Sequence, residues 1–212
     1  MEIIQKFVNY FITMFVIIDP IGVVPIFISI TAGVSRKFKK IMALRSVLFS
    51  SIVVILFFLF GDSIIKIFSI DINAFKVAGG IVLFILAMEM LFAGEKQTRI
   101  TKEEKEEIRE QALEEQGVWV VPLSIPALTG PVTMSSIIIF TSQENSLLYK
   151  MFIPIACILV LAIAYYFMIF ADRLIQKLGT AGINAVSRIM GIILLSISIK
   201  VCISGVKELW KT

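Results

Sequence analysis

Five of the six prolines of this chain fall in two short windows, residues 19–25 and 122–131, which lie inside long apolar stretches. Proline cannot donate a backbone hydrogen bond, and its ring clashes with the preceding helical turn. Backbone groups freed in this way cannot stay unpaired in hydrocarbon, so they must face protein, water or a ligand. The prolines therefore restrict the chain to folds in which two apolar helices are interrupted at places that need polar neighbours.

The two proline windows are related by an internal repeat. Shifting the sequence by 111 residues places Pro20 on Pro131 and aligns residues 72–94 with 183–205 without a gap, giving seven identities. Composition alone predicts about two or three identities over this length, so the match indicates a duplication. A duplicated apolar unit with one helix break in each copy is typical of transporters with discontinuous helices at their centre.

The apolar runs of the chain, which is 58% hydrophobic, are as long as membrane spans. A spanning helix needs about 20 mostly apolar residues, and a soluble helix of that length would keep a polar face. Six stretches meet this requirement: 7–31, 41–60, 72–93, 118–141, 147–171 and 183–204. The sequence therefore predicts an all-α polytopic membrane protein with no separate soluble domain.

The predicted spans divide the chain into three sections. Residues 1–94 form a first three-helix repeat and residues 118–212 a second, with helices 1 and 4 broken at Pro20 and Pro131. Between them, residues 95–117 hold eight Glu and five Lys or Arg, which predicts a solvated linker helix. Because each repeat has an odd number of spans, the second must enter the membrane from the opposite side, which gives two inverted repeats.

The distribution of basic residues predicts the orientation in a cytoplasmic (inner) membrane. With six spans, thirteen Lys or Arg lie on the side of the long linker and seven on the side of both termini, so both termini are expected outside. A second topology stays open, in which residues 7–31 and 118–141 turn back as re-entrant hairpins. The basic residues then divide fifteen to five with both termini inside. Six spans are preferred because two half-segments of about 18 Å each can cross about 30 Å of hydrocarbon.

The candidate site lies at the two helix breaks. Asp19 directly before Pro20 predicts an N-cap with proline at the first helical position, and Gly130 before Pro131 offers a weaker version of the same start. A half-helix that begins inside the membrane points its positive dipole end at the centre, where it suits a carboxylate or another small anion. The predicted substrate-binding residues are Asp19, Pro20, Gly22, Ser124, Thr129, Gly130 and Pro131.

Asp19 has two alternative roles. A carboxylate at mid-membrane is costly and marks a functional site by default, so Asp19 is the candidate for binding a substrate ammonium or a coupling Na+ or H+. Alternatively, it only caps the half-helix, and one side chain can do both. Elsewhere, Asn73 and Asn184 occupy matched repeat positions and are predicted either to cap the third and sixth helices or to line the pathway.

The remaining composition argues against other classes of protein. The chain has no histidine, no helical pair of metal ligands and no nucleophile–base spacing, so no enzyme, metal or cofactor is expected. Cys157 and Cys202 fall in predicted spans and are interpreted as small packing residues. The net charge of +4 is assigned to loops near lipid headgroups and not to nucleic-acid binding. The expected partners are the lipid bilayer and a small solute, and the oligomeric state is left open.

At these residues the chain resembles the MarC family of bacterial and archaeal inner-membrane proteins. The resemblance covers nearly the whole length and rests on Asp19-Pro20-Ile21-Gly22 with Pro25, on 121–126 with Thr129-Gly130-Pro131, on 78–81 and on 188–191. It implies a six-span protein related to the lysine-exporter superfamily. It also implies a substrate class, because a branch of the family transports small neutral amino acids such as glycine and alanine. Val23 and Val132 stand where the family usually has asparagine and glycine.

The sequence thus predicts a secondary transporter of small neutral amino acids, with binding at the two breaks near the bilayer midplane. The half-helix starts at Pro20 and Pro131 would hold the carboxylate, and Asp19 with the hydroxyls of Ser124 and Thr129 would hold the ammonium or the coupling ion. Rocking between the repeats would give alternating access. Three alternatives remain: an exporter or channel for an ion or another small metabolite on the same scaffold, an intramembrane enzyme, and a structural subunit.

Overall fold

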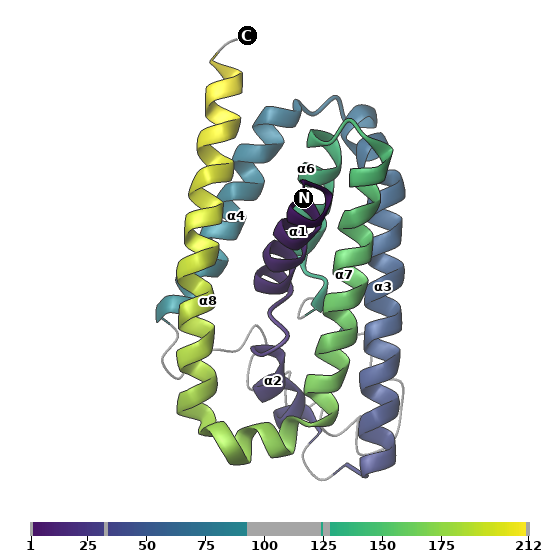
Figure 1. The fold of residues 1–212 in the computed structure, drawn as a ribbon, viewed down its shortest axis with the longest axis vertical. Helices are drawn as coiled ribbons and strands as arrows, with labels where there is room; N and C mark the ends of the chain where they lie inside the picture. The colour runs from purple at the N-terminus through teal and green to yellow at the C-terminus, as the bar shows by residue number, and fades with distance from the viewer. Residues whose placement is uncertain (1, 32–33, 93–123, 125–127, 211–212) are drawn as a thin grey trace.

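Helices make up all the regular structure in the part of the chain that is described. The computed structural model describes residues 2–31, 34–92, 124 and 128–210 (Figure 1). Its helices are α1 (Glu2–Ile18), α2 (Val23–Ile30), α3 (Arg36–Ile67), α4 (Ile72–Phe92), α6 (Pro131–Gln143), α7 (Leu147–Ile169) and α8 (Ala171–Leu209). No strand occurs among these residues, which confirms the all-α prediction for them.

Within the described residues, four helices are long and apolar enough to cross a membrane. They are Arg36–Gly61 of α3, Ile72–Phe92 of α4, Leu147–Ile169 of α7 and Ala181–Leu209 of α8. These coincide with four of the six predicted stretches. α1 is apolar but shorter, and the predicted linker 95–117 lies outside the described residues, as does most of the chain between 118 and 127.

The helices run back and forth along the long axis of the molecule (Figure 1). α1 and α2 follow one another toward the end where α3 begins, and α3 returns to the other end. α4 and α7 descend, whereas α6 and α8 ascend, and α8 bends at Gly179, which has a φ of 66°. α1 and α2 lie between the α4–α8 pair and the group formed by α3, α6 and α7.

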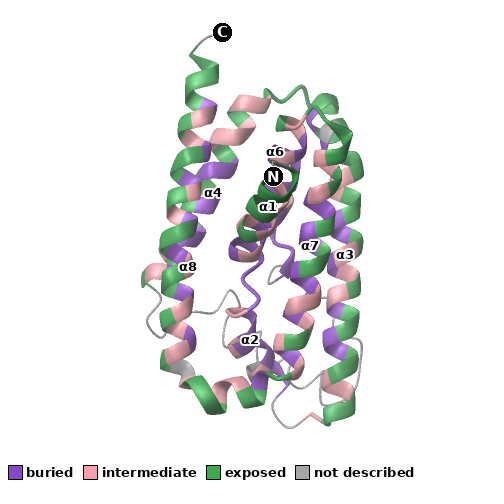
Figure 2. Cartoon of the chain, viewed as in Figure 1, coloured by how far each residue is buried: buried purple, intermediate pink, exposed green. Residues whose placement is uncertain are grey.

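The buried residues face the inside of this bundle, and large apolar side chains cover its outside. In Figure 2 the inward faces of α7 and α8 are buried while their outward faces are exposed. The exposed side chains include Ile52 and Leu59 of α3, Ile85 of α4 and Ile192 of α8. An outer surface made of leucine and isoleucine suits hydrocarbon and not water.

Helix boundaries differ from the predicted spans where polar residues continue a helix beyond its apolar run. α3 begins at Arg36, not at residue 41, and Ser35 caps it by accepting a hydrogen bond from the Phe38 N–H at 3.3 Å. Hydropathy marks only the part of a helix that suits lipid, so it misses such polar first turns.

The predicted capping role of the two asparagines is wrong. Asp71 caps α4, because its Oδ1 accepts hydrogen bonds from the N–H groups of Asn73 at 2.8 Å and Ala74 at 2.9 Å. Asn184 lies inside α8, since that helix already begins at Ala171. Asp71 lies one residue before the apolar stretch and the aligned repeat, both of which begin at residue 72.

Two glycines allow α4 and α8 to pack closely and antiparallel. A Cβ at Gly80 would lie 3.2 Å from the Ser198 carbonyl oxygen, and a Cβ at Gly191 would lie 3.2 Å from the Ala87 carbonyl oxygen. The 111-residue shift converts one contact into the other, because Gly80 maps on Gly191 and Ala87 on Ser198. The contact between the two helices thus follows the internal repeat of the sequence.

Candidate functional site

The chain leaves regular helix geometry between Ile18, the end of α1, and Val23, the start of α2. Asp19 has a φ of 48°, in the left-handed region that aspartate tolerates better than most residues. Its N–H donates to the Phe15 carbonyl at 3.0 Å, and its own carbonyl accepts from the Val23 N–H at 3.3 Å. Its Oδ1 accepts from the Gly22 N–H at 3.0 Å. Asp19 therefore caps the turn that leads into α2, but the prediction that this half-helix starts at Pro20 is wrong, because α2 begins at Val23 with Gly22 as its N-cap.

The interruption buries a carboxylate in the middle of the bundle. Asp19 is 9% exposed, and Pro20 beside it is also buried. Gly22 has an ordinary φ of −66°, but a Cβ at this position would overlap the Asp19 carboxylate. A side chain at residue 22 would therefore displace the Asp19 carboxylate from the position in which it accepts from the Gly22 N–H.

Ser124 and Thr129 lie together against α3. The Ser124 hydroxyl donates to the Ser46 carbonyl at 3.0 Å, and the Thr129 hydroxyl donates to the Ser124 carbonyl at 2.8 Å. The Thr129 Oγ1 also lies 3.4 Å from the Ser50 Oγ. All four of these residues are fully buried. Because each hydroxyl has one proton, the Ser124 and Thr129 oxygens can otherwise only accept, as an ammonium or a metal cation requires.

Gly130 and Pro131 form the start of α6, as the sequence predicts. Pro131 is the first residue of the helix, and Gly130 is the N-cap with extended backbone (φ −77°, ψ 177°). Gly130 has no side chain to accept a hydrogen bond, so the first N–H groups of α6, those of Val132 and Thr133, have no side-chain cap among the described residues. At the start of α2, by contrast, Asp19 accepts from the N–H of Gly22. An uncapped helix start offers N–H donors and a positive partial charge to an anion.

The predicted site residues form two groups, one around Asp19 and Gly22 and one around Ser124, Thr129 and Gly130. α1 contacts α6, and the residues directly before Asp19 and Thr129, Ile18 and Leu128, belong to one buried core. In Figure 1 the α1–α2 interruption and the start of α6 lie at a similar height, about midway along the bundle. The arrangement puts a carboxylate and an uncapped helix start at the same level of the molecule.

Other buried polar residues were missed by the sequence reading. Ser46 and Ser50 are spaced by four residues on an apolar helix, which was the available signal for a polar strip on one face of α3. Ser187 on α8 and Thr141 on α6 are buried, and their hydroxyls have no hydrogen-bond partner among the described residues. No group of three or more His, Cys, Asp or Glu residues suited to a metal ion occurs in the described part of the chain.

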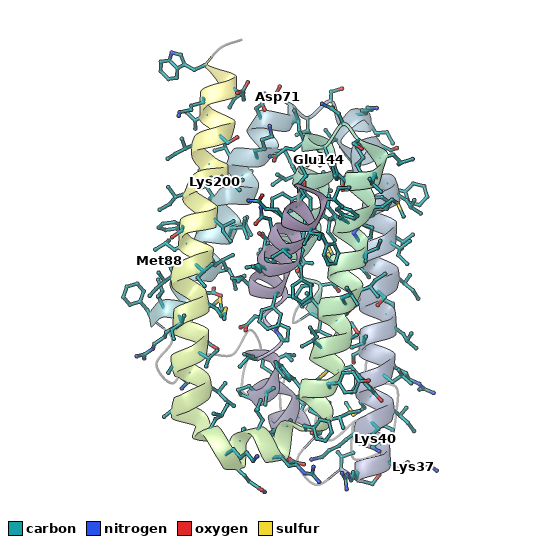
Figure 3. The ribbon with its side chains drawn as sticks, viewed as in Figure 1. Lys37, Lys40, Asp71, Met88, Glu144 and Lys200 are labelled. Carbon is teal, nitrogen blue, oxygen red and sulfur yellow. The ribbon has the colours of Figure 1, made fainter. Side chains whose placement is uncertain are left out.

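A polar cluster closes one end of the bundle (Figure 3). Glu144, which follows α6, accepts hydrogen bonds from the Lys6 Nζ at 3.2 Å and from the Tyr10 hydroxyl at 2.6 Å. The Lys6 Nζ also lies 3.9 Å from the centroid of the Tyr149 ring. These contacts join α1 to the α6–α7 connection, and Asp71 lies at the same end.

The described residues form helices only, four of them apolar and of spanning length, and their outer surface is apolar, so the chain is a multi-pass integral membrane protein. The sequence profile described as "MarC family integral membrane protein" matches residues 4–210. The chain therefore belongs to the MarC family.

Curated relatives extend over almost the whole chain. The UPF0056 membrane protein MJ1677 of Methanocaldococcus jannaschii is 30% identical over 96% of this chain and 97% of its own length. The UPF0056 membrane protein YvbG of Bacillus subtilis is 31% identical over 96% and 95%. The UPF0056 membrane protein YhcE of Escherichia coli is 30% identical over 95% and 92%. No solved structure matches this chain.

Proposed function

We propose that this chain is a secondary transporter of small neutral amino acids, built from six spans in two inverted repeats. The observation that carries the proposal is the buried carboxylate of Asp19 at an interruption between two helices, level with the uncapped start of α6. A zwitterionic amino acid has an ammonium group that suits the Asp19 carboxylate and a carboxylate that suits the start of α6. The assignment of small neutral amino acids as the substrate class is based on the resemblance to the amino-acid-transporting branch of the family.

The repeat arrangement is supported by the packing of α4 on α8. If an axis in the membrane plane relates the two repeats, each contact between them must occur twice with the partners exchanged. The contacts of Gly80 with Ser198 and of Gly191 with Ala87 are related in this way. Their antiparallel direction agrees with two copies that enter the membrane from opposite sides.

The two charged groups of the substrate would bind at different breaks. The N–H groups of Gly22 and Val23 are already bonded to Asp19, so the start of α2 has fewer donors to offer than the sequence suggested. We therefore assign the substrate carboxylate to the start of α6 at Gly130 and Pro131. The ammonium, or a coupling Na+ or H+, is assigned to the Asp19 carboxylate, with the Ser124 and Thr129 oxygens as further acceptors.

Counterflow in proteoliposomes tests this proposal. Vesicles loaded with unlabelled alanine or glycine should accumulate external labelled alanine or glycine with saturable kinetics, and protein-free vesicles should not. Imposed Na+ and H+ gradients then identify the coupling ion. Absence of accumulation with any small neutral amino acid under either gradient would overturn the substrate assignment. Flux that does not saturate would instead favour the alternative of a channel on the same scaffold.

The proposed topology predicts the sides on which three residues lie. The end with Arg36, Lys39 and Lys40 is basic, so the positive-inside rule places it in the cytoplasm and both termini outside. In a chain without its native cysteines, Glu2→Cys and Asp71→Cys should react with an impermeant maleimide on intact cells. Lys37→Cys should react only after permeabilisation. The re-entrant topology predicts Glu2 and Lys37 on the same side, so labelling of both together would rule out the six-span arrangement.

A further inference from the structure

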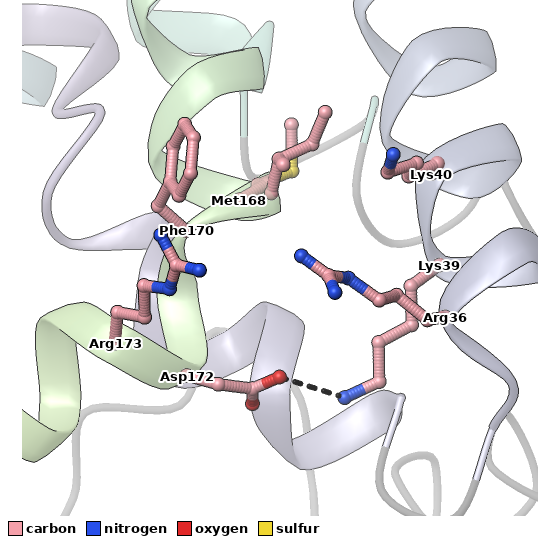
Figure 4. Close-up of a pocket in the computed structure, with 8 residues that line it drawn as sticks. Arg36, Lys39, Lys40, Met168, Phe170, Asp172 and Arg173 are labelled. Atoms are coloured by element: carbon pink, nitrogen blue, oxygen red, sulfur yellow. Dashed lines mark hydrogen bonds and ion pairs between the residues drawn. The ribbon is translucent and has the colours of Figure 1, made fainter.

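A pocket of about 230 Å³ lies at the end of the bundle where α3 begins and α7 passes into α8 (Figure 4). It is separate from the helix interruptions. The residues that line it are Arg36, Lys39, Lys40, Met168, Ile169, Phe170, Asp172 and Arg173. Arg36 and Arg173 reach into it from opposite sides.

The pocket has more positive charge than its own residues neutralise. It contains four basic side chains and one acidic one. Asp172 pairs with the Lys39 Nζ at 3.5 Å, and this carboxylate is 63% exposed to solvent. Among the residues that the structure describes, Arg36 and Lys40 have no carboxylate partner, and Arg173 lies over the Phe170 ring at 5.6 Å. The site therefore has the charge of an anion-binding site.

The start of α3 adds to this imbalance. Its first residues include Arg36, Lys37, Lys39 and Lys40, and no acidic residue lies in its first turn. The N-terminal end of a helix carries a positive partial charge, so basic residues there are locally unfavourable and an anion is favoured. A bound anion would relieve both the side-chain repulsion and the unfavourable placement of these charges.

The pocket has an apolar wall and lies at the depth of lipid headgroups. Met168, Ile169 and Phe170 form this wall. One candidate span, Arg36–Gly61, begins here and another, Leu147–Ile169, ends here, so the pocket lies at a boundary between lipid and water. We propose that it binds the phosphate of an anionic phospholipid. Arg36 and Arg173 would contact the phosphate oxygens, and Met168 and Phe170 the glycerol and upper acyl carbons. Inorganic phosphate shares the oxyanion chemistry but has nothing to place against the apolar wall.

The test is binding of phosphatidylglycerol to the full chain in a neutral detergent, titrated by native mass spectrometry. One Lys or Arg near an anionic lipid surface contributes about fivefold in affinity, so Arg36→Gln with Arg173→Gln should weaken binding by about 25-fold. The matched control is Lys37→Gln with Lys177→Gln. Both lysines are exposed and neither lines the pocket, and this control also removes two positive charges. The lipid affinity of this control should change by less than about twofold, whereas each pocket arginine that is lost should lower the affinity about fivefold.

The other possible outcomes either reject the site or identify inorganic phosphate, and not a lipid, as its anion. Equal losses in the two double variants would indicate general attraction to a basic surface and overturn the proposal, as would no binding at all. Displacement of the lipid by inorganic phosphate, with the same dependence on Arg36 and Arg173, would keep phosphate recognition and overturn the lipid assignment. If the double variant does not fold, the single variants Arg36→Gln and Arg173→Gln carry the comparison. This inference does not depend on the transport proposal.

Discussion

Asp19→Asn should insert and fold normally but reduce amino-acid counterflow about 10- to 100-fold, the range expected when a hydrogen bond to a charged group is lost. Asparagine tolerates the left-handed backbone of residue 19 and is as good an N-cap as aspartate. The substitution therefore removes the charge and keeps the turn between α1 and α2. Size-exclusion chromatography and circular dichroism check the fold, and the counterflow assay measures transport.

Two further variants separate charge from capping at Asp19. Asp19→Ala removes both and should also lower stability, because loss of an N-cap costs about 1 kcal/mol and alanine in the left-handed region about 1–2 kcal/mol. Asp19→Glu keeps the charge but lengthens the side chain that accepts from the Gly22 N–H. If Asp19→Asn transports as well as the native chain, the carboxylate serves only as a cap and the site proposal is wrong.

The second large effect is expected at the crossing of α4 and α8. Gly80→Val and Gly191→Val each force a side chain against a facing backbone carbonyl that cannot move aside freely. Overpacking of this kind costs about 1–3 kcal/mol per site, and distant sites add, so the double variant should lose about 2–6 kcal/mol. Unfolding by SDS in mixed micelles measures the loss.

Exposed alanines on the same two helices provide the control for this prediction. Ala78→Val on α4 and Ala185→Val on α8 introduce the same final side chain at outward positions. They should change stability by less than about 0.5 kcal/mol, as surface substitutions usually do. Equal stability of the control and glycine variants would show that the helices do not pack at the glycines as described.

The parts of the fold that depend on local sequence were predictable. Apolar runs located α3, α4, α7 and α8, because a helix of about 20 apolar residues is recognisable without its neighbours. The start of α6 at Pro131 was also predictable, as was a hydrogen bond from a nearby amide to Asp19, although the start of α2 at Val23 was not. Both follow from the missing N–H of proline and from the short reach of a carboxylate to nearby amides.

The parts that depend on contacts between distant residues were not predictable. Ser124 and Thr129 were expected to face a substrate, but part of their hydrogen bonding holds them to α3 and to each other. Ser46 lies 78 residues before Ser124, and no local pattern pairs the two. Likewise, the repeat identified Gly80 and Gly191 as matched positions, but only the packed helices reveal the facing carbonyls.

The close approach of α4 and α8 also limits how the two halves of the molecule can move. Backbones held this near cannot slide past one another, because the next side chain along each helix would strike the facing carbonyl. Rotation about the crossing point remains available. The Lys6–Glu144 and Lys39–Asp172 ion pairs lie at opposite ends of the bundle, and each joins a residue of the first half to one of the second. If the halves rock about this crossing, as the transport proposal requires, spreading one end would press the other together and the two ion pairs would break in turn.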